Sequence, residues 1–144
     1  MLLRERAGAR PLLLSERDGT SHYRTVFFVR RDSGIDSIEA LRGHSVAFQR
    51  PLSTSAYFMP VIELLERDIP LELLLSPSDP VSGNAVGYLF ARSELNIATW
   101  VHKHLVSAGV MSNLDWNNPR RMPELFKRDL RVIASTGPYP RALE

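Results

Sequence analysis

The sequence contains no cysteine and no long apolar run. Without cysteine there can be no disulfide bond, no thiol nucleophile and no cysteine-ligated zinc, while the cellular compartment stays undecided. Near the amino terminus, two leucines are followed at once by Arg4, Glu5 and Arg6, which end the apolar run well short of a signal-peptide core or a membrane span. The sequence as written therefore predicts no export signal.

The sequence also lacks the common catalytic motifs: the G-x-S-x-G elbow, the Walker phosphate loop, G-x-G-x-x-G and H-E-x-x-H. His102 and His104 lie two residues apart, which on a helix would direct them to different faces, and His22 and His44 are isolated. We therefore expect no catalytic residue, no metal and no cofactor. A Ser-His-Asp triad assembled from distant residues is the enzyme alternative that stays open.

The composition is that of an ordinary globular chain of 144 residues, 44% hydrophobic and 24% charged. This length suits one domain with a substantial core. The 18 basic and 16 acidic side chains give a net charge of +2. So small an imbalance shows no concentrated basic field, and a nucleic-acid partner is not implied.

The stretch from Gln49 to Leu65 is the most informative part of the chain. It follows a short apolar strand, Ser45–Phe48, and opens a helix, so that Ser53, Thr54 and Ser55 fall at the strand-to-helix turn. The first turn of a helix has free backbone N–H groups and the positive end of the macrodipole, and three hydroxyls add further donors. The pattern predicts an oxyanion site. The alternative is an ordinary N-cap at Ser53 with solvated neighbours.

Strands and helices alternate along the chain, which predicts an α/β fold with a mostly parallel sheet flanked by helices. The other expected strands are Pro11–Ser15, Tyr23–Val29, Pro70–Leu75, Leu95–Trp100 and Leu130–Ala134. The other expected helices are 36–43, Val81–Ala91, Val101–Ala108 and Pro123–Lys127. Asn113–Arg121 should be a polar loop and Pro138–Pro140 irregular. Pro60, inside the central helix, predicts a kink or a lost hydrogen bond near Ala56.

Four segments carry a resemblance to a known family: Y-R-T-V-F-F-V at 23–29, R-R-D-S-G at 30–34, I-E-A-L-R-G-H-S-V-A-F at 38–48 and R-P-L-S-T-S-A-Y-F-M-P at 50–60. In these motifs and their order, the chain from about Pro11 to Pro140 resembles the phosphate/phosphonate-binding proteins of ABC transporters. Those proteins have the type 2 periplasmic binding protein fold. The resemblance implies that this chain is one lobe of such a protein, the C-terminal one.

The resemblance also implies a set of ligand-binding positions. The matching residues are Ser53, Thr54, Ser55, Tyr23, Ser78, Trp100 and His102. The three hydroxyl residues and the tyrosine would hold the oxygens of a tetrahedral phosphonate or phosphate. Two positions depart from the family: Ala56 stands in place of the glycine after S-T-S, and Ser78 in place of a histidine that reads the other end of the ligand.

The expected organisation is that residues 1–22 are the end of the first lobe and the hinge approach, 23–134 the ligand-binding lobe, and 135–144 the returning hinge or tail. The resemblance implies a substrate-binding component, or a fragment of one, that serves an ABC permease for phosphonate, phosphate or phosphite in the periplasm. Because a partner lobe would supply the second set of donors, we expect millimolar affinity or none for this chain. The alternative is a sensory or dimerising module that kept the fold without ligand transport, and we expect a homodimer.

Overall fold

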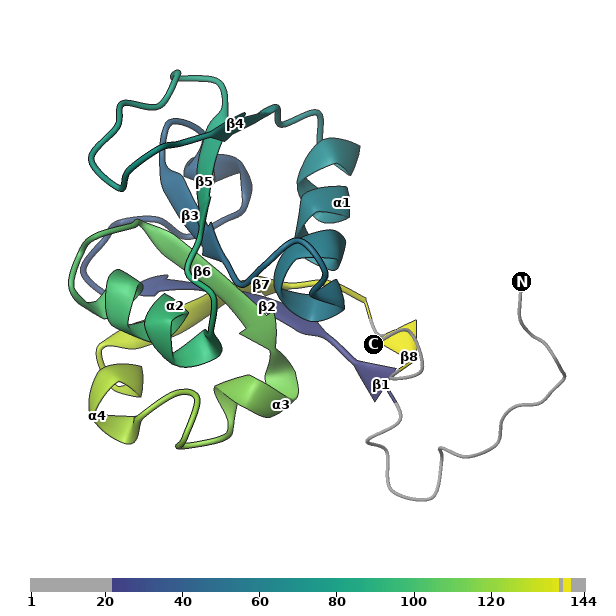
Figure 1. Ribbon diagram of the computed structural model, residues 1–144, viewed down its shortest axis with the longest axis vertical. Coiled ribbons are helices and arrows are strands. Elements are labelled where there is room, and N and C mark those ends of the chain that lie inside the picture. Colours follow the sequence, from purple (N-terminus) through teal and green to yellow (C-terminus); the bar gives the residue numbers. More distant parts are fainter. Residues whose placement is uncertain (1–21, 138, 141–144) are drawn as a thin grey trace, which may run out of the picture.

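A six-stranded mixed sheet forms the centre of the structure, a computed structural model that describes residues 22–137 and 139–140 (Figure 1). The strand order is β4-β5-β3-β6-β2-β7. In chain order the strands are β2 (Thr25–Arg30), β3 (Ser45–Phe48), β4 (Leu71–Leu73), β5 (Val86–Phe90), β6 (Ala108–Ser112) and β7 (Leu130–Ser135). The predicted strand at Pro11–Ser15, and nearly all of the predicted first-lobe segment 1–22, lie outside the described residues.

The sheet is parallel except for one strand. Strand β3 pairs in parallel with both β5 and β6, and β4 pairs in parallel with β5. Strand β2 is antiparallel to both of its neighbours, β6 and β7, so it runs against the rest of the sheet. The prediction of an α/β fold with a mostly parallel sheet flanked by helices is confirmed.

Helices flank the sheet (Figure 1). They are α1 (Met59–Glu66), α2 (Glu94–His102), α3 (Asn113–Trp116) and α4 (Glu124–Lys127), with a 3₁₀ turn η1 (Glu39–Leu41) and a π-helical segment η2 (Thr54–Phe58) that runs directly into α1. Within the described residues, no helix has the length and apolar content needed to span a bilayer. The predicted helices at 36–43 and Pro123–Lys127 correspond to the short elements η1 and α4.

A separate two-stranded ladder lies beside the main sheet. Strand β1 (His22–Tyr23) pairs antiparallel with β8 (Tyr139–Pro140), which brings the two ends of the described chain together (Figure 1). The prediction that 138–140 would be irregular was wrong for Tyr139–Pro140. A proline tolerates this position because an edge strand need not use every backbone N–H in a ladder.

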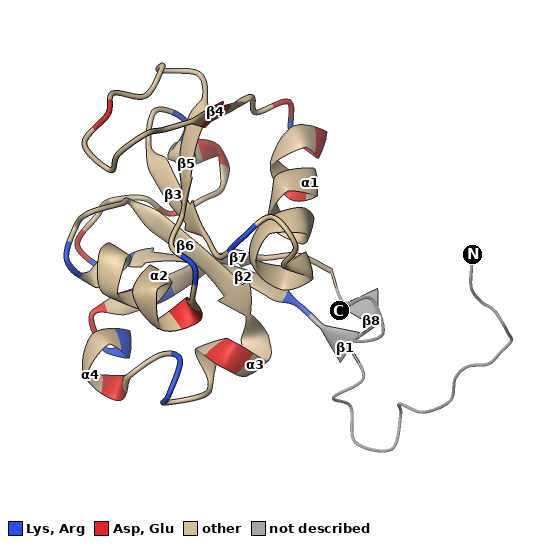
Figure 2. Cartoon of the chain, in the orientation of Figure 1, with Lys and Arg blue, Asp and Glu red and all other residues tan. Residues whose placement is uncertain are grey.

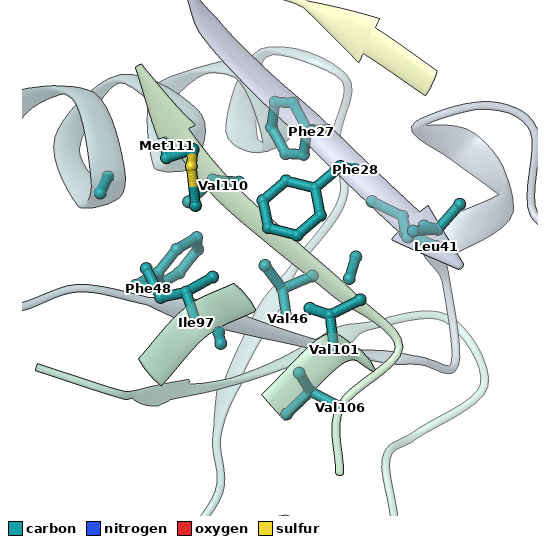
Figure 3. Packing of buried hydrophobic residues seen from close by; sticks show 14 of the residues in the cluster. Phe27, Phe28, Leu41, Val46, Phe48, Ile97, Val101, Val106, Val110 and Met111 are labelled. Carbon is teal, nitrogen blue, oxygen red and sulfur yellow. The ribbon is translucent and has the colours of Figure 1, made fainter. Parts of the chain in front are cut away.

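The core lies where α2 covers β6, β2 and β3. Phe28 of β2 and Met111 of β6 belong to the same buried cluster as Ile97 and Val101 of α2, and Figure 3 shows these side chains in one region of the core. Gly109, between Ala108 and Val110 on β6, lets the helix approach closely, because a Cβ atom at that position would lie 2.5 Å from Ile97 Cγ2. The position of α2, and of everything on its first turn, therefore depends on this contact.

The region from 81 to 91 was predicted as a helix, and this was wrong. Val86–Phe90 forms β5, and Gly87 of that strand pairs with Ser45 on β3. Glycine is unfavourable in a helix interior by roughly 1 kcal/mol relative to alanine, so Gly83 and Gly87 argue against a helix. In the strand, Gly87 instead leaves room for the side chain of Val81, whose Cγ2 would lie 2.7 Å from an added Cβ.

The prediction was also wrong for the next two elements, because it placed a strand where a helix lies and a helix where the chain leads into a strand. Leu95–Trp100, predicted as a strand, lies inside α2, and the predicted helix Val101–Ala108 gives way after His102 to a chain that enters β6. The start of α2 is set by Ser93, whose Oγ accepts a hydrogen bond from the Asn96 N–H at 3.1 Å. This N-cap outweighs the β-branched residues of the segment, which favour a strand only weakly.

Candidate functional site

A cavity of about 410 Å³ opens beside the carboxyl ends of β3 and β6. Its walls come from η2, the first turn of α2, α3 and the loop that follows α3. The lining residues are Gln49, Arg50, Leu52, Ser53, Ser55, Glu94, Ser112, Leu114, Asp115, Asn118 and Arg121. Because β3 and β6 are parallel neighbours, their carboxyl ends meet at one edge of the sheet, where α/β proteins bind their ligands.

The start of η2 is shaped by Pro60. Proline has no N–H, so the Ala56 carbonyl oxygen, four residues earlier, lacks its usual helical donor. It accepts a hydrogen bond from the Gln49 N–H instead, at 2.9 Å, which ties the first turn of the helix to the end of β3. Ala56 itself has non-helical dihedral angles (φ −112°, ψ 17°). The predicted disturbance near Ala56 is confirmed, and it widens this turn into a π-helical one.

Three serines line the cavity. Ser53 is the N-cap of η2 and its Oγ accepts from the Ala56 N–H at 3.1 Å, while the Ser112 Oγ accepts from the Asp115 N–H at 3.0 Å. A hydroxyl that accepts one hydrogen bond still has its own proton to donate. Ser55 is only 5% exposed, and its hydroxyl has no hydrogen-bond partner within the described part of the chain. The cavity therefore presents several hydroxyl donors to a ligand.

The charged groups of the cavity form a compact cluster. The Arg121 Nη1 atom lies 3.1 Å from Asp115 Oδ1 and 3.5 Å from Glu94 Oε1, and the Gln49 Nε2 group donates to Glu94 Oε2 at 2.8 Å. Figure 2 shows the acidic residues of α2's first turn and of α3 beside the basic loop between α3 and α4. With Arg50, the lining has two cations and two carboxylates, so its formal charge is balanced.

Among the predicted site residues, the structure brings Ser53 and Ser55 to the cavity but leaves others outside its lining. Thr54 lies between them in sequence and does not line it. The backbone of Tyr23 lies in β1, and its side chain is outside what the structure describes. Ser78 lies in the loop after β4, where its hydroxyl is 3.0 Å from the Ser76 Oγ.

The loop that carries Ser78 is organised by Asp79. Its carboxylate accepts hydrogen bonds from the N–H groups of Leu75, at 2.9 Å, and Ser76, at 3.1 Å. These two backbone donors hold the pKa of Asp79 below its usual value, since they favour the charged form. Ser78 is thus part of a self-contained turn and not of the cavity wall.

Trp100 and His102 were expected in the cleft, but the structure places them in the second half of α2. The cavity is at the opposite end of that helix, at Glu94. The His102 Nε2 atom lies 2.8 Å from Asp129 Oδ2, which lowers the pKa of Asp129, and the ring stacks on Phe126 at 4.4 Å. The expectation depended on reading 95–100 as a strand whose end would face the site. As a helix, the same segment presents its first residues there.

The acidic and basic side chains of the cavity were missed by the sequence reasoning. Glu94 and Asp115 follow capping serines, Ser93 and Ser112, and the S-x-x-D spacing at 112–115 was a signal of a helix start. A helix predicted to start at Ser112 would have placed Asp115 at a strand-to-helix turn, beside the serines of η2. Within the described residues, no group of three or more histidine, aspartate or glutamate side chains could hold a metal ion.

Comparison with family models gives a match over nearly the whole chain. The model describes the periplasmic substrate-binding protein of phosphonate ABC transporters, and it matches residues 1–143. Comparison with curated proteins gave no match.

Several solved structures share the fold. XAC2383 from Xanthomonas citri is 48% identical with a TM-score of 0.85, and its chloride-bound form matches over 91% of this chain and 47% of its own. Its ATP-bound form matches over 92% and 48%, with the same identity and TM-score. PhnD1 from Prochlorococcus marinus, in complex with methylphosphonate, is 20% identical over 87% of this chain and 45% of its own, with a TM-score of 0.65. The chain thus spans about half the length of these proteins.

Proposed function

The chain belongs to the family of periplasmic substrate-binding proteins of phosphonate ABC transporters, and from this premise we propose that its cavity binds the oxyanion group of phosphonate, phosphate or phosphite. The main support for this proposal is the buried hydroxyl group of Ser55. A buried hydroxyl without a partner in the described chain, in a cavity wall, leaves a donor unsatisfied unless a ligand or water accepts from it.

The chemistry of the lining suits such a ligand. A tetrahedral oxyanion needs many hydrogen bonds, and the hydroxyls of Ser53, Ser55 and Ser112 can each donate one. The helix that begins at Thr54 continues through α1 to Glu66, so its dipole adds partial positive charge at the same point. The 48% identical XAC2383 has been observed with ATP, which also carries phosphoryl oxygens. Recognition of the phosphoryl group rather than its substituent would accommodate all these compounds.

We propose that residues 23–134 are the ligand-binding lobe, with 1–22 leading from a first lobe and 135–144 returning to it. The ladder between β1 and β8 supports this arrangement, because two adjacent crossing strands are what a hinge between lobes requires. In this proposal the protein is non-catalytic, acts in the periplasm and delivers its ligand to an ABC permease.

A titration with and without the Ser55 hydroxyl tests the oxyanion site. We expect the chain to bind phosphate, phosphite and methylphosphonate with a Kd on the order of 1 mM, because donors from one lobe only are present. Ser55→Ala should weaken binding about 10-fold, the effect of losing a hydrogen bond to a charged group. Chemical-shift titration by NMR measures such affinities directly.

Ser78→Ala is the matched control, since Ser78 is exposed and lies outside the cavity lining. Its Kd should equal that of the unmodified chain. Equal binding by the Ser55→Ala variant would contradict the site, and micromolar binding by the monomeric chain would contradict the expected weakness of a single lobe.

A dimerising module is the second candidate function. Leu52 and Phe58, on either side of the serines, are 90% and 57% exposed, and large exposed apolar side chains favour association. We expect light scattering to show a dimer whose dissociation constant rises on Leu52→Ser. A monomer at high concentration for the unmodified chain would contradict this candidate while leaving the oxyanion site intact.

A further inference from the structure

Arg121 holds an unusual position in the cavity wall. A single terminal nitrogen of its guanidinium, Nη1, contacts carboxylates from two different helices, Asp115 of α3 at 3.1 Å and Glu94 of α2 at 3.5 Å. The two ion pairs hold the guanidinium in place through its Nη1 atom. Such anchoring reduces the conformational freedom that a long side chain would otherwise lose on binding a ligand.

The opposite edge of the same guanidinium is unused. Arginine has five N–H donors, two of which belong to Nη1. Within the described chain, the Nε and Nη2 groups of Arg121 have no hydrogen-bond partner, and the side chain is 48% exposed. The Nε and Nη2 groups form the planar fork that matches two oxygens of a phosphoryl or carboxylate group. Arg121 lines the same cavity as Ser55, and it thus brings a free, pre-oriented anion-binding edge to this site.

Both carboxylates pair with Arg121, and both oxygens of Glu94 have a protein partner. Glu94 is only 8% exposed; one of its oxygens accepts from Gln49 and the other faces Arg121. A buried carboxylate without such partners would repel an oxyanion and attract a cation. Because Arg121 contacts both acids, a cationic ligand group would have to displace it to reach either of them.

We propose that Arg121 is the specificity-determining residue of this cavity, binding the oxyanion through its Nε–Nη2 edge and excluding ligands that carry an ammonium group by occupying Glu94 and Asp115. The proposal rests on the oxyanion site proposed above and adds the substrate class: phosphoryl compounds whose substituent is uncharged or absent. Without Arg121 the formal charge of the lining would fall from zero to −1, since only Arg50 would oppose the two acids.

Two phosphonates with different substituents separate the classes, methylphosphonate with a neutral methyl group and 2-aminoethylphosphonate with an ammonium group. The unmodified chain should bind methylphosphonate at least about 5-fold more tightly, because an ammonium would be repelled by Arg121, which already pairs with both carboxylates. Arg121→Gln should weaken methylphosphonate binding at least about 10-fold, as expected for a charge-assisted pair, and should reverse the preference between the probes. Arg121→Lys keeps the charge and loses the fork, so its affinity for methylphosphonate should lie between those of the unmodified chain and of Arg121→Gln.

Arg120→Gln is the matched control, because Arg120 is exposed and lies outside the cavity lining. It should leave both affinities unchanged. Tighter binding of 2-aminoethylphosphonate by the unmodified chain overturns the proposal without any variant, and so does an unchanged preference in a folded Arg121→Gln protein.

The failures of the two proposals are distinguishable. If Ser55→Ala weakens methylphosphonate binding and Arg121→Gln does not, the oxyanion site stands and the role of Arg121 is overturned. If the unmodified chain binds neither probe, both proposals are overturned together. If both variants weaken methylphosphonate binding and only Arg121→Gln changes the preference, both proposals are supported.

Discussion

Replacement of Phe28 by alanine is expected to lower the free energy of unfolding by about 3–5 kcal/mol, the usual loss for a fully buried phenylalanine. The Phe28 ring has no exposed surface and packs 5.1 Å from the Trp116 ring, centroid to centroid. It also lies over the contact between α2 and β6 (Figure 3). Urea denaturation followed by circular dichroism would measure the loss.

The Phe28→Ala substitution should also disturb the candidate site. Trp116 ends α3, the helix that carries Asp115, so a gap beneath Trp116 would loosen one wall of the cavity. Phe58→Ala is the control, because Phe58 is more than half exposed and should cost less than about 1 kcal/mol. Equal losses for the two variants would show that the buried cluster is not where the stability of the fold is concentrated.

Replacement of Gly109 by alanine is expected to destabilise the protein by about 1–3 kcal/mol through overpacking. The added Cβ would lie 2.5 Å from Ile97 Cγ2, 2.7 Å from Phe28 Cζ and 3.0 Å from Val101 Cγ2. None of these atoms can move freely, since two belong to β-branched side chains of α2 and one to a rigid ring. Relief requires α2 to move away from the sheet, and thermal unfolding would record the loss of stability.

Gly83→Ala is the matched control for Gly109→Ala. An added Cβ at Gly83 meets nothing within 4 Å, so this variant should be neutral or slightly more stable. The displacement of α2 in Gly109→Ala should also move Glu94 and weaken oxyanion binding, while Gly83→Ala should leave it unchanged. Equal stability of the two variants would contradict the close approach of α2 to β6.

Within the described residues, local patterns correctly predicted β2, β3 and the turn that leads into η2 and α1. The apolar runs that became β2 and β3 are continuous and rich in β-branched and aromatic residues, and the turn between β3 and η2 carries its own capping serine. The effect of Pro60 on Ala56 followed from the missing N–H alone. The family was also identified correctly from these same segments, as the match over residues 1–143 confirms.

Between Val81 and Ser112 local patterns were misleading. The segment of α2 contains β-branched and aromatic residues that suit a strand, and β6 contains Gly109, which weakens a strand taken by itself. Both assignments are decided by packing. The glycine is favourable because a helix lies against it, and the helix, capped by Ser93, is further stabilised by burying Ile97 and Val101 on that sheet.

By itself, the sequence determined the strand-to-helix turn with its serines, because capping and the proline effect act between residues only a few positions apart. Only the tertiary structure decided which charges face those serines. Glu94 and Arg121 are 27 residues apart, and they meet because β3 and β6 end at the same edge of the sheet. Side chains so far apart in sequence leave no local pattern, since their contact depends on strand order and on how closely α2 packs against Gly109.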